Sequence, residues 1–165
     1  MLTQNRLKEL LHYDPETGIF TWIKPNANRI KAGSAAGHLD SVGYLRLTID
    51  YKSERLHRLA CLYMTGRLPP VHADHINGIK TDNRWINLRS VSKEINAKNK
   101  CIRSDNNSGV TGVYWRRDRN KWAVQVRVNR KTKTIGSFSS FDDAVIARKT
   151  AEEECGYHKN HGRPA

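Results

Sequence analysis

The chain has 165 residues, a net charge of +13 at pH 7 and a sequence pI of about 10.0. Such a charge indicates association with nucleic acid or another polyanion, although a basic ribosome-associated or structural protein would carry it too. An apolar fraction of 38% permits small hydrophobic cores and argues against a chain that is disordered throughout. The length suits one domain or two to three small modules.

The three cysteines are odd in number and far apart, at Cys61, Cys101 and Cys155. Without a Cys-x-x-Cys pair, they predict neither a disulfide framework nor a cysteine-based zinc ribbon. The first eleven residues lack the apolar core of a signal peptide, and no apolar run is long enough to cross a membrane. We therefore expect a reduced, cytoplasmic setting without membrane contact.

The first predicted module spans residues 1–70 and has the pattern of a small α/β unit. Leucines at helical spacing, short alternating runs and turn residues predict its elements. In chain order these are a helix within 1–11, strands at 19–23 and 44–50, an exposed loop at 26–37, and a helix at 57–65. Gly66 stops the second helix, and the pair Pro69 and Pro70 marks a boundary.

The second predicted module spans residues 71–103 and reads as hairpin, loop and helix. Asn77 and Gly78 form a tight-turn signal after the polar pair Asp74 and His75. Ser92 is a suitable N-cap for a helix that we expect to run to about Lys100. On that helix the spacing places Lys93, Asn96 and Lys100 on one face.

This module holds the residue types that phosphodiester hydrolysis needs. Asp74 and Asn96 offer oxygen ligands of the kind that a hard divalent cation prefers, and His75 offers an imidazole to activate water. Because successive strand residues point apart, a bulge or bend is needed to bring Asp74 and His75 to one phosphate. The amide of Asn87 can hydrogen-bond across the loop and hold the backbone near His75.

A polar linker at 104–108 leads to the third module, residues 109–165. Its alternating pattern predicts three strands, and the capping residue Ser140 opens a helix. The expected strands are 112–117, 121–129 and 131–138, and the helix runs to about Cys155. A three-stranded antiparallel sheet packed on one helix is the natural arrangement.

One face of this sheet is expected to carry an aromatic ring, arginines, a glutamine and hydroxyls. By alternation from the inward Trp122, Val124 and Ile135, the outward residues are Tyr114, Arg116, Gln125, Arg127, Thr132 and Thr134. Arginine reads guanine, glutamine reads adenine, and the remaining groups hold phosphates, so such a face can enter a major groove. The alternative is a charged face that only meets solvent.

The central residues resemble the HNH nuclease superfamily, whose fold is called ββα-metal, in its phage and intron-encoded homing endonucleases. The resemblance rests on Asp74-His75, Asp82-Asn83-Arg84, Asn87-Leu88-Arg89 and Glu94-Ile95-Asn96, with His57-Arg58-Leu59-Ala60 upstream. It implies that His75 is the general base, that Asp74 and Asn96 hold one divalent cation, and that Asn87 is structural to the active loop. The third named position is often His but is Asn96 here, which favours Mg²⁺, with Mn²⁺ possible, over zinc or nickel.

Residues 108–156 resemble the APETALA/ethylene-response-factor DNA-binding domain of plants, which is also fused to phage HNH endonucleases. The matching stretches are Gly109 to Val113, Trp122 to Val126, Ile135 to Phe138, and the helix with Ala144 and Ala147. The resemblance implies double-stranded DNA as partner. Arg89, Lys93 and Lys100 are expected to add DNA contacts beside the nuclease core.

The sequence thus predicts an α+β protein with a small α/β module, a ββα-metal core and a C-terminal sheet on one helix. The expected function is metal-dependent DNA cleavage, by nicking or double-strand cutting, without a small-molecule cofactor; the sequence is compatible with a monomer but leaves the oligomeric state open. Two other functions stay open: a non-catalytic, sequence-specific DNA-binding regulator with a vestigial nuclease core, and a basic structural RNA-binding protein.

Overall fold

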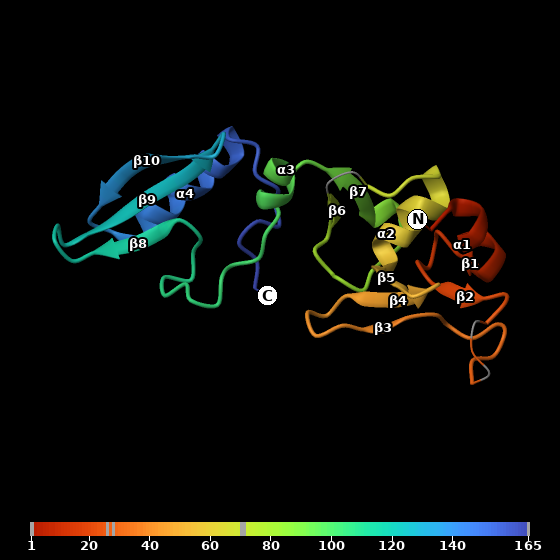
Figure 1. The fold of residues 1–165 in the computed structure, drawn as a ribbon. Helices are drawn as coiled ribbons and strands as arrows, with labels where there is room; N and C mark the ends of the chain where they lie inside the picture. The colour runs from red at the N-terminus through yellow and green to blue at the C-terminus, as the bar shows by residue number, and fades with distance from the viewer. Residues whose placement is uncertain (1, 26, 28, 70–71, 165) are drawn as a thin grey trace. The chain divides into compact units, whose positions relative to one another are not determined.

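The computed structural model describes residues 2–25, 27, 29–69 and 72–164, and shows a mixture of helices and small antiparallel sheets (Figure 1). This confirms the predicted α+β class. The chain divides into two compact units, which we call the N-terminal unit (residues 1–91) and the C-terminal unit (residues 92–165). The predicted boundary between residues 70 and 71 lies outside the described residues.

The N-terminal unit contains the helices and strands that the sequence predicted, together with several shorter strands. Its elements are α1 (Gln4–Leu10), β1 (Leu11–Tyr13), β2 (Phe20–Trp22), β3 (His38–Leu39), β4 (Leu45–Ile49), β5 (Lys52–Arg55), α2 (Leu56–Thr65), β6 (His72–His75), a 3-10 turn η1 (Trp85–Asn87) and β7 (Leu88–Val91). The sequence did not predict β1, β3 and β5, because strands of two to four residues are too short to show an alternating pattern.

The ends of both helices in this unit follow from local chemistry. The hydroxyl of Thr3 accepts a hydrogen bond from the backbone N–H of Arg6 and caps α1. Leu11, which we expected to continue this helix, instead begins β1 and pairs with Trp22 of β2. Gly66 ends α2 in the left-handed region, at a φ of 76°, where glycine carries no steric penalty.

One hydrophobic cluster holds the N-terminal unit together. It extends from Leu7 in α1 through Tyr13 and Phe20 to Leu88 in β7, and Tyr13 stacks on Phe20 with ring centroids 4.6 Å apart. Helix α2 packs against α1 and against strands β4, β5 and β6. The β6–β7 hairpin therefore shares its core with the segments that precede residue 70.

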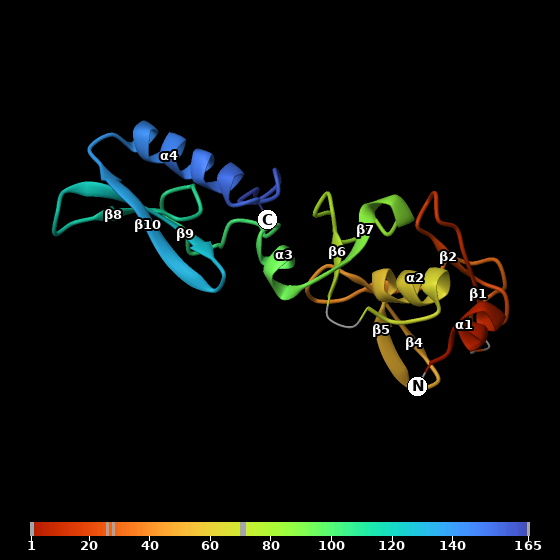
Figure 2. The same ribbon diagram turned by 90° about the horizontal axis from the view of Figure 1, so that it is seen from above.

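The C-terminal unit contains α3 (Lys93–Ala97), β8 (Val113–Arg116), β9 (Lys121–Val128), β10 (Lys131–Phe138) and α4 (Phe141–Glu154). The three strands form an antiparallel sheet in the order β10-β9-β8, and α4 lies along one face of it (Figures 1 and 2). The core between sheet and helix is small and centres on Val113, Val124 and Ala144. The predicted sheet packed on one helix is confirmed.

Helix α3 is shorter than we expected. Ser92 caps it as predicted, but it ends at Ala97 and not near Lys100. After Lys98 the chain bonds to the C-terminal tail: the N–H of His158 donates to the Lys98 carbonyl, and the N–H of Gly162 donates to the Lys100 carbonyl. These long-range bonds take the place of the helical bonds that would have continued α3.

Candidate functional site

The predicted catalytic pair lies at the end of strand β6, in a hairpin with β7. Asp74 pairs with Arg89 across the hairpin, and His75 pairs with Leu88. We expected a bulge or a bend here, but the pairing runs from His72 to His75 without a register shift, so these four residues contain no bulge. The two side chains accordingly take opposite faces, with that of His75 buried at 4% exposure and that of Asp74 11% exposed.

The carboxylate of Asp74 is held by its cross-strand partner. The Nε and Nη2 groups of Arg89 donate to Asp74 Oδ2 at 3.1 and 2.9 Å. Such charge-assisted bonds fix the direction of a carboxylate. Arg89 was expected to contact DNA, but in this structure it forms an ion pair inside the protein, with its side chain 29% exposed.

The imidazole of His75 lies in a polar contact inside the core. Its Nε2 atom is 3.0 Å from Oδ1 of Asn83, a residue that is itself only 1% exposed. Burial lowers the pKa of His75 below the ordinary value of 6.5, because a charged imidazolium is poorly solvated there. The ring is therefore neutral at pH 7 and can accept a proton.

Two further rings pack around His75, and we call Tyr44, His57 and His75 the imidazole cluster. The centroid of the His57 ring lies 4.8 Å from that of His75, and the Tyr44 ring lies 5.3 and 6.0 Å from His57 and His75. Burial, with the nearby His75 second, lowers the pKa of His57 to about 3. The guanidinium of Arg55 stands 4.1 Å above the Tyr44 ring. His57 is itself only 4% exposed, so it packs inside the protein.

The loop between the two strands, residues 76–87, is braced by Asn87. Its Nδ2 donates to the Asp82 carbonyl at 2.8 Å, and its Oδ1 accepts from the backbone N–H of Asn77 at 2.9 Å. Asp82 in turn accepts hydrogen bonds from Arg84, which is the main reason that the pKa of Asp82 falls to about 2. The amide of Asn87 thus makes the cross-loop contacts expected of it, while its catalytic importance stays a prediction.

The first segments of the chain also support this loop. The hydroxyl of Tyr13 donates to the Asn83 carbonyl at 2.7 Å. Gly18, at a φ of +75°, lies so close to the loop that an added Cβ would be 2.4 Å from the carbonyl carbon of Asn83 and from the nitrogen of Arg84. Sequence reasoning missed this support, because no local pattern joins residues that are about 70 positions apart.

The two predicted metal ligands belong to different units. Asp74 is in the N-terminal unit, whereas Asn96 is in α3 of the C-terminal unit, so their joint binding of a cation stays a prediction. Their donor atoms are a carboxylate and an amide oxygen, which suit Mg²⁺ with several waters retained. In the described part of the chain, no three His, Cys, Asp or Glu side chains group closely enough to hold a metal ion.

The C-terminal unit places the six predicted sheet residues on one face. Thr132 pairs with Arg127, and Thr134 pairs with Gln125. Tyr114 pairs with Ala123, two positions before Gln125, so Tyr114 and Arg116 lie on that same face. The face is opposite Val113 and Val124, against which α4 packs.

At three positions the sheet differs from a simple exposed face, through burial, a bulge or an ion pair. Ala123 lies on the outward face but is buried, at 3% exposure. The register between β9 and β10 shifts at Ile135, between Thr134 and Gly136, which is a bulge. Arg116 donates to the carboxylate of Asp118 and is 35% exposed, so its predicted DNA contact competes with an internal one.

A groove of about 640 Å³ within the C-terminal unit collects five of the residues expected to touch DNA. Its lining includes Lys93, Lys100, Gln125, Arg127 and Thr132. Lys93 and Lys100 come from α3 and the segment after it, and the others come from β9 and β10. Positive charge and hydrogen-bond donors therefore converge on one concave surface.

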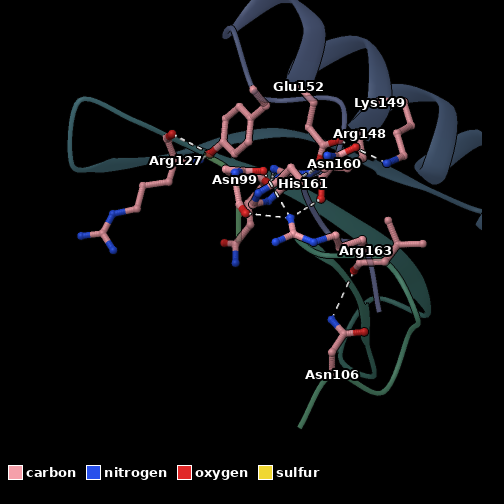
Figure 3. Close-up of polar contacts among 12 residues, drawn as sticks. Asn99, Asn106, Arg127, Arg148, Lys149, Glu152, Asn160, His161 and Arg163 are labelled. Carbon is pink, nitrogen blue, oxygen red and sulfur yellow. Dashed lines mark hydrogen bonds and ion pairs between the residues drawn. The ribbon is translucent and has the colours of Figure 1, made fainter. Parts of the chain in front are cut away.

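Beside this groove, the C-terminal half of α4 forms a buried polar cluster. Arg148 donates from Nε to Glu152 at 2.9 Å, with the two side chains 2% and 9% exposed. Figure 3 shows this pair beside His161 and shows the guanidinium of Arg127 directed away from it. The backbone of Arg127 is fixed by the hydroxyl of Tyr157, which leaves its side chain to project outward.

No helix in the described residues is both long and apolar enough to cross a membrane. The three cysteines Cys61, Cys101 and Cys155 are free, which agrees with the expected absence of a disulfide framework.

Comparison with known proteins gives a family match over the candidate site. A comparison with curated protein sequences found no match. A solved structure described as "DNA binding and cleavage by the HNH homing endonuclease I-HmuI" aligns over 89% of this chain and 78% of that one, at 23% identity and a TM-score of 0.43. Residues 54–98 match the profile of a family described as HNH endonuclease. The matched span runs from β5 through α3 and includes Asp74, His75, Asn87 and Asn96.

Proposed function

We propose that this chain is a metal-dependent DNA endonuclease that hydrolyses phosphodiester bonds. The observation that carries the proposal is the HNH endonuclease match at residues 54–98, centred on the hairpin that holds Asp74 and a neutral His75. The net charge of +13 supports a polyanionic substrate.

In this proposal His75 is the general base. Its lowered pKa keeps the imidazole unprotonated at pH 7, as a base that removes a proton from water must be. Asn87 keeps the backbone of residues 76–87 in place beside it through its two cross-loop hydrogen bonds. The effect of a positioned base is on the order of 10²–10⁴ in rate.

Asp74 and Asn96 are proposed to hold one divalent cation, with Mg²⁺ preferred and Mn²⁺ accepted. When bound, such a cation stabilises the added negative charge on the phosphate and on the departing oxygen. Arg89 keeps the Asp74 carboxylate oriented through Oδ2. The amide oxygen of Asn96 completes an oxygen donor set of the kind that Mg²⁺ selects.

The C-terminal unit is proposed to grip double-stranded DNA, in the manner of an APETALA/ethylene-response-factor domain. Its support is the common face of Tyr114, Gln125 and Arg127 and the groove that Lys93 and Lys100 also line. These positions mix groups that read base edges with groups that neutralise phosphate.

One observation favours the alternative, a DNA-binding regulator with a vestigial nuclease core. His75 is only 4% exposed, and Arg89 occupies one oxygen of Asp74. Both features limit the access of a phosphate to these groups, which cleavage needs and DNA binding alone does not.

A plasmid assay separates the two functions. Supercoiled DNA is incubated with the full chain in Mg²⁺, in Mn²⁺ and in EDTA, and nicked, linear and intact forms are resolved on a gel. We expect nicked or linear product with either metal and intact plasmid in EDTA. Retarded but uncut plasmid in all three conditions would establish the regulator instead.

A further inference from the structure

The C-terminal unit has a second hollow besides the groove that Lys93 and Lys100 line. It has a volume of about 530 Å³ and lies beside β8, the outermost strand of the sheet, so we call it the edge pocket (Figure 1). One wall is the loop before β8, and the other is the β8–β9 hairpin. Its lining includes Arg103, Asn107, Ser108, Trp115, Arg117 and Trp122.

Trp115 gives the edge pocket a partly exposed aromatic ring. The residue is 41% exposed, and its ring centroid lies 5.2 Å from that of Trp122, at an interplanar angle of 66°. The Trp122 ring in turn lies 4.7 Å from the ring of Phe141, the first residue of α4. Edge-to-face contacts of this kind are favourable and hold each ring in one orientation. Trp115 is therefore a supported platform on which a planar ligand can stack.

The loop wall of the edge pocket is held by its own polar contacts. The hydroxyl of Ser108 lies 2.6 Å from the Val113 carbonyl oxygen, which ties the loop to the start of β8. Asp105 also lines the pocket, but Arg103 donates to its two carboxylate oxygens at 2.8 and 2.7 Å. The charges of this pair balance, so the net charge of the lining comes from Arg117.

Arg117 differs from its neighbours in the turn after β8. Asp118 pairs with Arg116 and with Arg119, whereas Arg117 forms no ion pair among the described residues and is exposed. A guanidinium in this state can bind a phosphate without first losing an internal partner. The edge pocket thus combines an aromatic platform with one available positive charge.

We propose that the edge pocket binds one unpaired nucleotide of a DNA strand, with its base stacked on Trp115 and its phosphate beside Arg117. This inference rests on the proposed function in one respect, that DNA is the partner. An indole ring stacks on any base, because every base has a π-face. The amide of Asn107 can both donate to and accept from a base edge. A paired base is already stacked on its neighbours, so the pocket selects an unpaired one.

The edge pocket is compatible with duplex contacts on the outward face of the sheet. Because side chains alternate along a strand, Tyr114 belongs to the outward face and Trp115 to the opposite one. Both residues line the pocket, which therefore lies at the edge between the two faces. Binding of an unpaired nucleotide there leaves the outward face open to a duplex.

Binding of short single-stranded DNA tests the proposal. Fluorescence anisotropy of the full chain in EDTA gives Kd for a labelled oligothymidylate and for an abasic strand of the same length, which has the same phosphates but no bases. The variants are Trp115→Ala, Trp115→Phe and Arg117→Ala. Tyr51→Ala removes a fully exposed ring between β4 and β5 and is one control. Arg119→Ala is the other, since Arg119 shares the turn with Arg117 but does not line the pocket.

We expect the wild type to bind oligothymidylate on the order of 10-fold more tightly than the abasic strand, as base–aromatic stacking does elsewhere. Trp115→Ala should abolish this preference, and Trp115→Phe should reduce it. Arg117→Ala should weaken both strands alike, and both controls should keep the preference.

Equal affinity of the wild type for the two strands, or a preference that survives in Trp115→Ala, would overturn the proposal. If circular dichroism shows that Trp115→Ala does not fold, Trp115→Phe takes its place, and an unreduced preference there overturns the proposal as well.

Plasmid cleavage in Mg²⁺ keeps this inference apart from the proposed function. A wild type that cleaves plasmid but shows no preference for oligothymidylate would overturn only the role of the edge pocket. A wild type that has the preference but leaves plasmid intact would overturn only the proposed cleavage.

Discussion

The two units expose their candidate functional groups to very different degrees. In the N-terminal unit, His75, Asn83 and Asn87 are 4%, 1% and 6% exposed and belong to hydrogen bonds within or beside the main core. In the C-terminal unit, Tyr114 is 43% exposed and Arg127 projects from the sheet. The buried groups of the N-terminal unit are held by contacts within the protein, whereas the groups of the C-terminal unit are exposed to solvent.

This difference predicts two kinds of mutational response. A change in the imidazole cluster or the loop 76–87 alters packing as well as chemistry, so each variant needs a measurement of folding beside that of activity. A change on the outward sheet face should leave folding intact, because surface substitutions are usually within about 0.5 kcal/mol.

The largest effect is expected from His75→Ala, which should abolish plasmid cleavage while leaving DNA affinity nearly unchanged. Loss of a general base typically costs ~10²–10⁴ in rate. The control is His72→Ala, three residues earlier in the same strand and on the opposite face. Circular dichroism of both variants establishes that they fold, and wild-type cleavage by His75→Ala would contradict its role.

The second-largest effect on cleavage is expected from the loss of a proposed metal ligand. Asp74→Asn and Asn96→Ala are expected to raise the Mg²⁺ concentration needed for half-maximal cleavage, because the first removes the negative charge of a carboxylate ligand and the second removes an amide oxygen. Asp74→Asn is preferred to alanine, since an amide oxygen can still accept from Arg89 and spares the ~1–3 kcal/mol cost of an unpaired group. Full activity of the wild type in EDTA would refute the metal dependence.

A smaller effect concerns stability in acid. The pKa of His57 is about 3 in the folded protein and 6.5 ordinarily, so below pH 6.5 the unfolded chain binds a proton that the folded chain does not. The free energy of unfolding should therefore fall as the pH drops from 6.5 toward 3. By pH 5 the contribution of this one group is about 2 kcal/mol.

Urea unfolding at pH 7, 6 and 5 tests this expectation. His57→Leu should flatten the decline relative to the wild type, while part remains because burial also lowers the pKa values of His75 and His161. His12→Leu is the control, since His12 is exposed in strand β1. Identical declines in His57→Leu and the wild type would show that His57 does not titrate in this window.

The smallest effects are expected on the outward sheet face and in the groove that Lys100 lines. Arg127→Ala and Lys100→Ala should weaken DNA binding without altering the cleavage rate of DNA that is already bound. Each should also reduce, by about one, the slope of the logarithm of the binding constant against the logarithm of the salt concentration. Arg116→Ala should do less, because Asp118 already engages that guanidinium. If Arg127 reads a base, its loss should instead cost about 1–3 kcal/mol at preferred sequences only.

Binding titrations at several salt concentrations separate these cases, with Arg6→Ala as a control. Arg6 lies in α1 and bonds to Glu9 and Asp50. Unchanged affinity and slope in the double variant of Arg127 and Lys100 would mean that this face only meets solvent.

Periodicity in the sequence predicted much of the fold. Strand β10 has the predicted bounds, and the caps at Ser92 and Ser140 are where the pattern placed them. Helix α3 ended early because its continuation bonds to a tail about sixty residues away. The sequence also suggested that Asn87 braces the loop, but it could not reveal the contact of Asn83 with His75, since nothing local distinguishes a buried amide from an exposed one.

The bonds between residues 98–102 and the tail also determine how the C-terminal unit should be isolated for separate work. A fragment that starts at residue 109 would lose Lys98, whose amine donates to the Cys155 carbonyl at 2.6 Å, and Asn99, which accepts from Arg163. The tail would lose these hydrogen-bond partners, and the groups that they cover would be exposed to water. A fragment from residue 92 to the end keeps both partners of these hydrogen bonds, and we expect it to fold and to stay soluble when concentrated.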